Sequence, residues 1–320
     1  MINQKKTIGN MQHKDTKVCL VCSSTKFRRG ENIKSIMHIV PEGITRANEV
    51  HVILDRCSGC GLLIDRKYFN GYDYESLYSK DTIYSKSNYD FSNFPKKYST
   101  DPIDVLTPYL NKSITALEIG FCTTELMQRV GKKVKKISGL ELDPLAVKKA
   151  VELGFDAREG SVKQAFSNMK FDLIYAIALF EHLTSPKEWL NEVHSHLNAG
   201  GLVLIQLPNP QSLNALMSKK LSRHSWDMFT EPGHVAHYKK RHLKKLFENS
   251  GFQLKRFATS TIRVRGKIPF IPGRWLWLES RIQRATLKSP LMMNLYTLFL
   301  LTLDKFKIGD TQILVFEKKI

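Results

Sequence analysis

From Asp101 onward, short apolar runs alternate with helical runs, and this alternation restricts the fold more than any other feature of the sequence. Such a pattern is typical of a parallel sheet whose strands are joined by crossover helices. Seven runs are predicted as strands (115–119, 136–140, 156–158, 171–176, 202–207, 253–260 and 312–317) and five as helices (101–110, 124–130, 144–153, 186–197 and 241–250). The sequence therefore predicts an α/β fold over this part of the chain.

Carboxylates at the ends of the first two predicted strands indicate a ligand site. In an open sheet of this kind, ligands bind beyond the carboxyl ends of the strands. Glu118 and Gly120 close the first strand in ALEIGFCTTEL, and Glu141 closes the second in GLELDP. The two carboxylates are 141 − 118 = 23 residues apart, a spacing that suits one nucleoside ligand whose ribose hydroxyls the second carboxylate binds.

The same segments, in the same order, resemble the class I S-adenosylmethionine-dependent methyltransferases. LEIG resembles the glycine-rich first motif of that family, and GLELDP resembles its acidic second motif. FDLIYAIALFEHL resembles the motif of the fourth strand, and the Gly-Gly and Pro-Asn segments of NAGGLVLIQLPNP follow it. The resemblance covers about residues 101–260 and the final strand. It implies a Rossmann-like sheet of seven strands, mostly parallel with an antiparallel last strand, and S-adenosylmethionine as methyl donor.

The resemblance also implies cofactor contacts for individual residues. The backbone of Gly120, Phe121 and Cys122 would lie against the methionine part of the cofactor, Glu118 would help to fix its amino group, and Glu141 would hold the ribose. The remaining assignments are Leu142 and Val162 beside the adenine, Ser161 at its exocyclic amine, and the backbone of Ala176 to Ala178 near the methionine ammonium.

The first motif departs from the family at two positions. The family usually has Gly-x-Gly-x-Gly, whereas Cys122 and Thr124 stand at the two later glycine positions of this chain. Side chains there can crowd the turn on which the cofactor rests. Two hypotheses follow: the chain tolerates both residues and binds the cofactor, or the domain is a degenerate scaffold without catalysis.

Methyl transfer to a hydroxyl needs a base for the acceptor's proton, and histidines are the candidates. His234 lies in EPGHVAHY, a loop that lies over the acceptor site in the family, and His182 follows the fourth strand. His237 and Asn209 are further candidates near the same cleft. The alternative for each is structural: a packed or capping histidine, and a turn at Asn209.

Four of the five cysteines form two C-x-x-C pairs, Cys19 with Cys22 and Cys57 with Cys60. Each pair can place two thiolates on one metal, and four sulfurs complete a tetrahedral zinc site. Strand-like stretches at 34–40 and 49–54 separate the pairs, as in a zinc ribbon. Iron and disulfides are the alternatives. With four sulfur ligands the predicted zinc is structural.

These features predict a division into a zinc-ribbon module (1–66), a tyrosine-rich linker (67–100) and a methyltransferase domain (101–320) with a helical insertion at about 261–311. The linker tyrosines either pack the two parts together or line a substrate cleft. The insertion combines Trp275 and Trp277 with arginines and a long apolar run, which fits an interfacial helix over 270–303. The alternative is a hairpin that covers the sheet or forms a homodimer.

The net charge of +19 favours an anionic partner. We expect a phosphate-bearing small molecule or glycan as acceptor, with a sugar hydroxyl as the methylated group. A nucleic-acid methyltransferase is the rival, ranked lower because the basic residues are scattered and no nucleic-acid-binding module accompanies them. The N-terminus lacks the pattern of a secretory signal, so we expect a cytoplasmic protein, peripheral to the inner membrane face if the insertion binds lipid.

Overall fold

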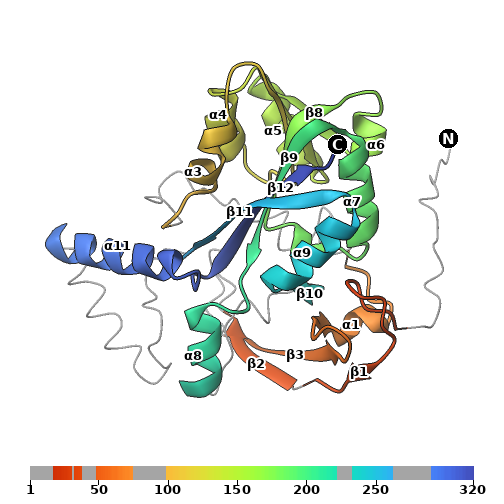
Figure 1. Cartoon of the computed structure of the whole chain (residues 1–320), viewed down its shortest axis with the longest axis vertical. Coiled ribbons are helices and arrows are strands. Elements are labelled where there is room, and N and C mark those ends of the chain that lie inside the picture. Colours follow the sequence, from red (N-terminus) through yellow and green to blue (C-terminus); the bar gives the residue numbers. More distant parts are fainter. Residues whose placement is uncertain (1–16, 31, 38–47, 75–98, 222–232, 262–289) are drawn as a thin grey trace.

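The computed structural model describes residues 17–30, 32–37, 48–74, 99–221, 233–261 and 290–320. Within them the chain forms a seven-stranded sheet covered by helices and a smaller antiparallel sheet built mainly from the N-terminal part (Figure 1). The four cysteines of the C-x-x-C pairs lie at the smaller sheet, and the strands predicted after Asp101 form the larger one.

The larger sheet confirms the predicted fold class. Its strands are β5 (Thr115–Ile119), β6 (Lys136–Glu141), β7 (Asp156–Glu159), β8 (Phe171–Ile177), β9 (Leu197–Pro208), β11 (Phe252–Ser260) and β12 (Thr311–Lys318), in the order β11-β12-β9-β8-β5-β6-β7. β12 is antiparallel to both of its neighbours, and the other pairs are parallel. The strand order reverses at β5, between β6 and β8, which places the ligand crevice at the carboxyl end of these strands.

Helices cover both faces of this sheet. α3 (Pro102–Leu106), α4 (Glu125–Gly131) and α5 (Pro144–Glu152) contribute to one buried apolar cluster, and α6 (Val162–Ala165), α7 (Pro186–Ser195) and α9 (Lys240–Asn249) contribute to the other. Asp101 and Asp143 cap the first turns of α3 and α5, each followed by a proline at the first helical position. Pro108 cannot donate an α-helical hydrogen bond, so the helix predicted to Leu110 ends at Leu106 and continues as a 3₁₀ turn, η2 (Thr107–Tyr109).

The smaller sheet contains β1 (Phe27–Arg28), β2 (Asn32–Met37), β3 (Asn48–Cys57), β4 (Leu63–Asp65) and β10 (Ala236–His237), with α1 (Arg66–Phe69) after β4. The predicted strands at 34–40 and 49–54 correspond to β2 and β3, which pair antiparallel. β10 was not predicted, and it pairs with β4 through Ala236 opposite Ile64 and His237 opposite Leu63. The ribbon and the larger domain therefore share one sheet, and the domain boundary at residue 66 stays a prediction.

The C-terminal part contains α8 (Leu213–Leu221), between β9 and β10, and α11 (Pro290–Lys305), which leads into β12. Most of the predicted insertion, including Trp275 and Trp277, lies outside the described residues, as do the linker tyrosines beyond Tyr74. Tyr74 itself is buried and donates a hydrogen bond to Asp65. No helix within the described ranges is long and apolar enough to cross a bilayer.

Candidate active site and zinc site

The turn after β5 begins at Gly120, and its backbone conformation favours glycine. Gly120 has φ = +72°, a left-handed value that side chains disfavour. Its amide donates to the carbonyl of Leu140 at 2.8 Å, which ties the turn to the end of β6. A Cβ at this position would approach Leu179 Cδ1 to 3.2 Å. This glycine therefore sets the path of the chain where the two sequence motifs meet.

Glu141 reaches from the end of β6 to this turn. Its Oε2 accepts a hydrogen bond from the amide of Cys122 at 2.9 Å, and its Oε1 accepts one from the amide of Leu142 at 2.6 Å. Leu142 is 57 % exposed, so the carboxylate stands at an open rim of the crevice. The structure thus brings together Gly120, Cys122 and Glu141, which the sequence placed in one cofactor site.

The two departures from the glycine motif differ in conformation. Cys122 has φ = +43° and an exposed thiol, so this position keeps the left-handed backbone of a glycine while carrying a side chain. Thr124 has φ = −80°, at the N-cap of α4, and its hydroxyl accepts a hydrogen bond from Gln128. Only the substitution at Cys122 therefore carries a backbone strain.

The Phe121 side chain is directed into the core, so this residue offers only its backbone to the crevice. The ring is 4 % exposed and packs over Gly139, where a Cβ would lie 2.9 Å from two ring atoms. Glu118 is also buried, and it accepts a hydrogen bond from the hydroxyl of Tyr175 at 2.8 Å. Burial raises the pKa of Glu118 to about 8, which keeps this carboxyl protonated at neutral pH.

The remaining predicted cofactor residues line neighbouring strand ends. Ser161 caps α6 by accepting from the amide of Gln164, and Val162 is buried beneath it. Ala176 is buried at the end of β8, and Ala178 follows with φ = +52° and an amide hydrogen bond to Gln206 O at 2.7 Å.

The two predicted catalytic histidines lie next to each other, beside a carboxylate. η3 (Phe180–His182), which follows β8, carries Glu181 and His182, and the segment before β10 carries His234. The rings of His182 and His234 are 4.7 Å apart at their centroids, and His234 Nε2 lies 3.9 Å from Glu181 Oε1. The amide of Val235 donates to the carbonyl of Glu181 at 2.9 Å and joins the two segments.

Glu181 completes this cluster, and the sequence singled it out only as part of the Glu-His motif. Its side chain is 2 % exposed and that of His234 is 5 % exposed, so the pair is shielded from water. The signal in the sequence was a carboxylate next to a histidine, four residues after the end of the buried strand β8.

Burial keeps the neighbouring histidines neutral. It lowers the pKa of His182 to about 4 and that of His237 to about 3. His182 Nδ1 lies 2.9 Å from the carbonyl of Gly233, so this nitrogen carries the proton and Nε2 keeps its lone pair. Asn209 forms a turn, since its side chain donates to Gly309 O and accepts from the amide of Gln211.

The sequence profile of a family described as a methyltransferase domain matches residues 44–256, which are 213 of the 320 residues. The chain belongs to this methyltransferase family. No curated protein matches the sequence.

Several solved structures are similar to this methyltransferase at low sequence identity. An S-adenosylmethionine-dependent methyltransferase from Archaeoglobus fulgidus is 15 % identical over 68 % of this chain and 91 % of its own, with a TM-score of 0.44. The N-methyltransferase NodS from Bradyrhizobium japonicum, in complex with S-adenosylhomocysteine, is 13 % identical over 69 % of this chain and 85 % of its own, with a TM-score of 0.42. A methyltransferase from Mesorhizobium loti is 12 % identical over 67 % and 96 %, with a TM-score of 0.44.

The four paired cysteines of the methyltransferase converge at one point. Cys19 Sγ lies 3.6 Å from Cys60 Sγ, and Cys22 Sγ lies 3.5 Å from Cys57 Sγ. All four sulfurs lie within 4.8 Å of one another. A zinc ion with Zn–S bonds of about 2.3 Å has sulfurs about 3.8 Å apart at the corners of its tetrahedron. The observed separations fit such an ion and are far longer than the roughly 2.05 Å of a disulfide bond.

The two C-x-x-C turns have the same backbone geometry. In each, the amide of the first cysteine donates to a carbonyl five residues later, Cys19 to Ser24 and Cys57 to Leu62. The residue after each second cysteine is left-handed, Ser23 at φ = +58° and Gly61 at φ = +78°. The two matching turns bring the four sulfurs together, and this arrangement suits a four-sulfur metal site.

Proposed function

We propose that this methyltransferase transfers the methyl group of S-adenosylmethionine to a sugar hydroxyl of a phosphate-bearing small molecule or glycan. The observation that carries the proposal is the position of Glu141 across the Gly120 turn, together with the Glu181–His234 pair at the end of the neighbouring strand. The first arrangement suits the donor, and the second suits an acceptor that loses a proton.

The chain's own residues would hold the donor by its ribose and its methionine part. Glu141 would accept hydrogen bonds from the two ribose hydroxyls, as a carboxylate at the end of a second strand does in dinucleotide sites. The left-handed backbone at Gly120 and Cys122 would pass close to the methionine part. Bound S-adenosylmethionine supplies a methyl group on a positively charged sulfur, which is already a good leaving group.

His234 would act as the base. As the acceptor oxygen forms its bond to the methyl carbon and the carbon–sulfur bond breaks, His234 would take the hydroxyl proton on Nε2. The Glu181 carboxylate, 3.9 Å from that nitrogen and almost fully buried, would stabilise the resulting imidazolium. His182, fixed through its Nδ1 by Gly233, would pack against the His234 ring and orient it.

The cysteine cluster would hold one structural zinc ion in a reducing, cytoplasmic setting. Four thiolates fill the tetrahedral coordination of zinc, so no position remains for a substrate. The ion would instead fix the ribbon, whose β4 pairs with β10 close to His234.

α11 supports peripheral contact with an anionic membrane. Leu291, Leu295, Leu298 and Phe299 are 68 %, 53 %, 61 % and 43 % exposed and follow the i, i+4, i+7, i+8 spacing of one helix face. Flotation with phosphatidylglycerol vesicles tests this contact, with Leu295→Glu as the variant. A homodimer buried on the same face is the alternative, and gel filtration of the two proteins without lipid distinguishes it.

Calorimetric titration with S-adenosylmethionine and S-adenosylhomocysteine tests the proposed reaction first. Micromolar binding supports it, and nucleotide sugars and lipid-linked glycans are then screened as acceptors. His234→Asn should keep donor binding and lose methyl transfer. A folded protein that binds neither ligand contradicts the proposal. Preferential methylation of RNA or DNA, lost at high salt, would favour the nucleic-acid alternative.

A further inference from the structure

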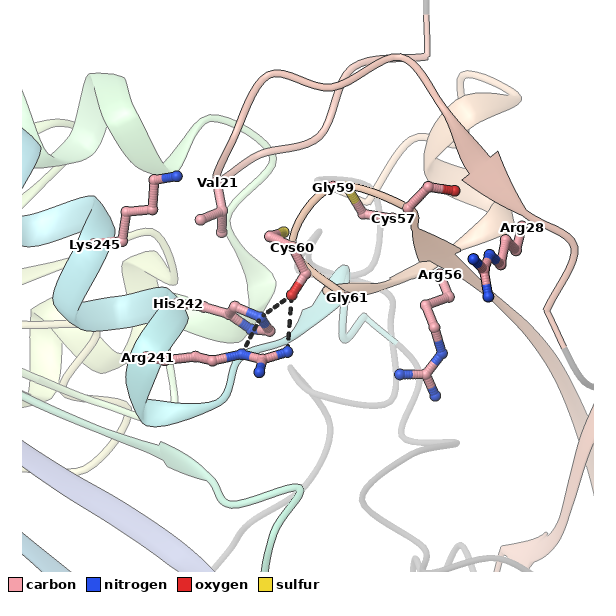
Figure 2. Close-up of a pocket in the computed structure, with 11 residues that line it drawn as sticks. Val21, Arg28, Arg56, Cys57, Gly59, Cys60, Gly61, Arg241, His242 and Lys245 are labelled. Carbon is pink, nitrogen blue, oxygen red and sulfur yellow. Dashed lines mark hydrogen bonds between the residues drawn. The ribbon is translucent and has the colours of Figure 1, made fainter.

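A basic pocket lies between the second C-x-x-C turn and α9, apart from the Glu181–His234 pair. Its volume is about 560 Å³, within the range of small-molecule sites. Figure 2 shows Arg28 and Arg56 on one side, Arg241 and Lys245 from α9 on the other, and the turn of Cys57 to Gly61 between them. No carboxylate lines the pocket among the described residues.

Two pairs of like charges converge on this pocket. Arg28 and Arg56 are directly opposite each other in the antiparallel pair of β1 and β3, where like charges destabilise a sheet. Arg241 and Lys245 are four residues apart on α9, where like charges destabilise a helix. Several unfavourable charge pairs at one place, without a contact that compensates them, are typical of a functional site.

α9 adds a third unfavourable arrangement. The helix begins at Lys240, its first turn has no acidic residue, and Arg241 stands near its positive end. Burial and the nearby charges of Arg241 and Arg56 lower the pKa of Lys239. Among the described residues, the first turn of α9 therefore has no acidic side chain that neutralises the positive potential at this end of the helix.

Nearby acceptors do not compensate these cations. Arg241 donates to the carbonyl of Cys60 at 2.9 Å, a neutral acceptor. Asp55, next to Arg56 in the chain, is engaged by Arg66 through both carboxylate oxygens. Within the described ranges, none of the four pocket cations forms an ion pair with a carboxylate.

A zinc ion on the four cysteines would account for only part of this charge. Four thiolates on a divalent ion leave two negative charges, whereas the pocket carries four positive ones, so two remain (4 − 2 = 2). Three of the four cations are arginines, whose planar guanidinium groups match the oxygens of phosphate.

We infer that this pocket binds a diphosphate group of a small molecule, held by Arg28 and Arg56 from the ribbon and by Arg241 and Lys245 from α9. The anion would relieve both like-charge pairs at once. The segment that carries His234 continues directly through β10 into α9, so it links the pocket to the proposed acceptor site. The diphosphate belongs either to the acceptor or to a separate ligand.

Calorimetric titration of the zinc-loaded protein with inorganic pyrophosphate tests the inference. The measurement needs no S-adenosylmethionine, so its failure is distinguishable from failure of the proposed methyl transfer. Arg56→Gln and Lys245→Gln should each weaken pyrophosphate binding by about tenfold or more, because each removes a charged hydrogen bond. Lys148→Gln is the matched control, since Lys148 lies on α5 in an exposed pair with Glu152 and should change binding by less than about twofold.

Thermal unfolding gives a second readout. Without ligand, Arg56→Gln should unfold at the wild-type temperature or above it, because the substitution removes a repulsion. Pyrophosphate should raise the unfolding temperature of the wild type and not that of the variant. Zinc content is measured before and after titration, because pyrophosphate also binds divalent ions.

Three results would overturn the inference. One is the absence of pyrophosphate binding by zinc-loaded protein, and another is an equal loss in the Lys148→Gln control. The third is faster zinc loss from Arg56→Gln without pyrophosphate binding, which would show that the cations only neutralise the thiolates. Once an acceptor is known, a raised KM with unchanged kcat in Lys245→Gln assigns the diphosphate to that acceptor. An unchanged KM assigns it to a separate ligand.

Discussion

The amide of Cys122 donates a 2.9 Å hydrogen bond to Oε2 of Glu141, across the crevice between two parallel strands. This bond holds the carboxylate at the glycine turn, although the two residues belong to different motifs. The hydroxyls of a ribose bound there would replace the amide of Cys122 as hydrogen-bond donors to Glu141. If Glu141 holds the ribose as proposed, binding of S-adenosylmethionine should depend on the charge of this carboxylate as well as on its position.

Glu141→Gln should weaken S-adenosylmethionine binding by about tenfold or more, because a charged acceptor is lost. Glu159→Gln is the matched control, since Glu159 stands opposite Glu141 at the exposed end of the neighbouring strand β7. Calorimetry with both variants checks the prediction. Equal affinity in the two variants would contradict the assignment of Glu141 to the ribose.

Cys122→Gly should stabilise the protein. Cys122 is left-handed at φ = +43°, and a residue with a Cβ pays about 1 kcal/mol or more for this conformation. Thr124→Gly should not increase the stability, because Thr124 has an ordinary φ of −80°. A glycine at this position would also lose more conformational freedom on folding than threonine does. Urea unfolding measures both effects. If Thr124→Gly stabilises the chain as much as Cys122→Gly, strain at Cys122 is not the reason.

Donor affinity of the same two variants separates a tolerated motif from a degenerate one. We expect Cys122→Gly to change the affinity for S-adenosylmethionine by less than about fivefold, because the turn already has the backbone conformation that glycine would take. An increase of a hundredfold would show instead that the cysteine side chain obstructs the donor.

The larger sheet could be predicted because most of its strands can be recognised from short stretches of the sequence alone. Strands β5, β8, β9 and β12 each contain an apolar run of several residues, and the motif order indicated the topology through the family resemblance. The early end of α3 was missed because the apolar pattern to Leu110 outweighed Pro108, which lacks the amide that an α-helix needs.

β10 could not be predicted, because two residues carry no periodicity and their partner lies far away in the chain. Ala236 pairs with Ile64 across 236 − 64 = 172 residues. The basic pocket was hidden for the same reason, since only the register of β1 and β3 places Arg28 opposite Arg56. The four cysteines, in contrast, were found because their spacing is local within each pair.

Cys57→Ser should abolish zinc binding and destabilise the ribbon. The protein should contain about one zinc ion per chain, and removal of one of four thiolates breaks the tetrahedral set. Cys122→Ser is the matched control, because Cys122 is the fifth cysteine and lies exposed at the other site. Metal analysis of both variants after purification under reducing conditions checks this. Zinc-free wild-type protein would remove the assignment.

Acid should destabilise the protein through its buried histidines. The folded-state pKa of His182 is about 4, against about 6.5 for an exposed histidine, so between these values the unfolded chain binds more protons. Stability should fall as the pH drops from about 6.5 to 4 and then level off for this group. His182→Asn should flatten the curve in that window, as measured by urea unfolding from pH 7 to 4. An unchanged slope would show that His182 is not buried in solution.

Glu118 should have the opposite dependence on pH. Its folded-state pKa is raised by burial to about 8 from an ordinary value near 4.5, so the folded chain binds more protons between these values. Its contribution to stability is present below about pH 4.5 and is lost as the pH rises to 8. Glu118→Gln mimics the protonated acid and should therefore be more stable than the wild type at pH 8, with little difference at pH 4.

The hydrogen bond from the Tyr175 hydroxyl to Glu118 gives a second comparison. At pH 8, Tyr175→Phe should cost less stability in the Glu118→Gln protein than in the wild type. A Glu118→Gln protein that is less stable than the wild type at pH 8 would show that the Glu118 carboxylate is ionised in the folded protein and stabilises it as a charge.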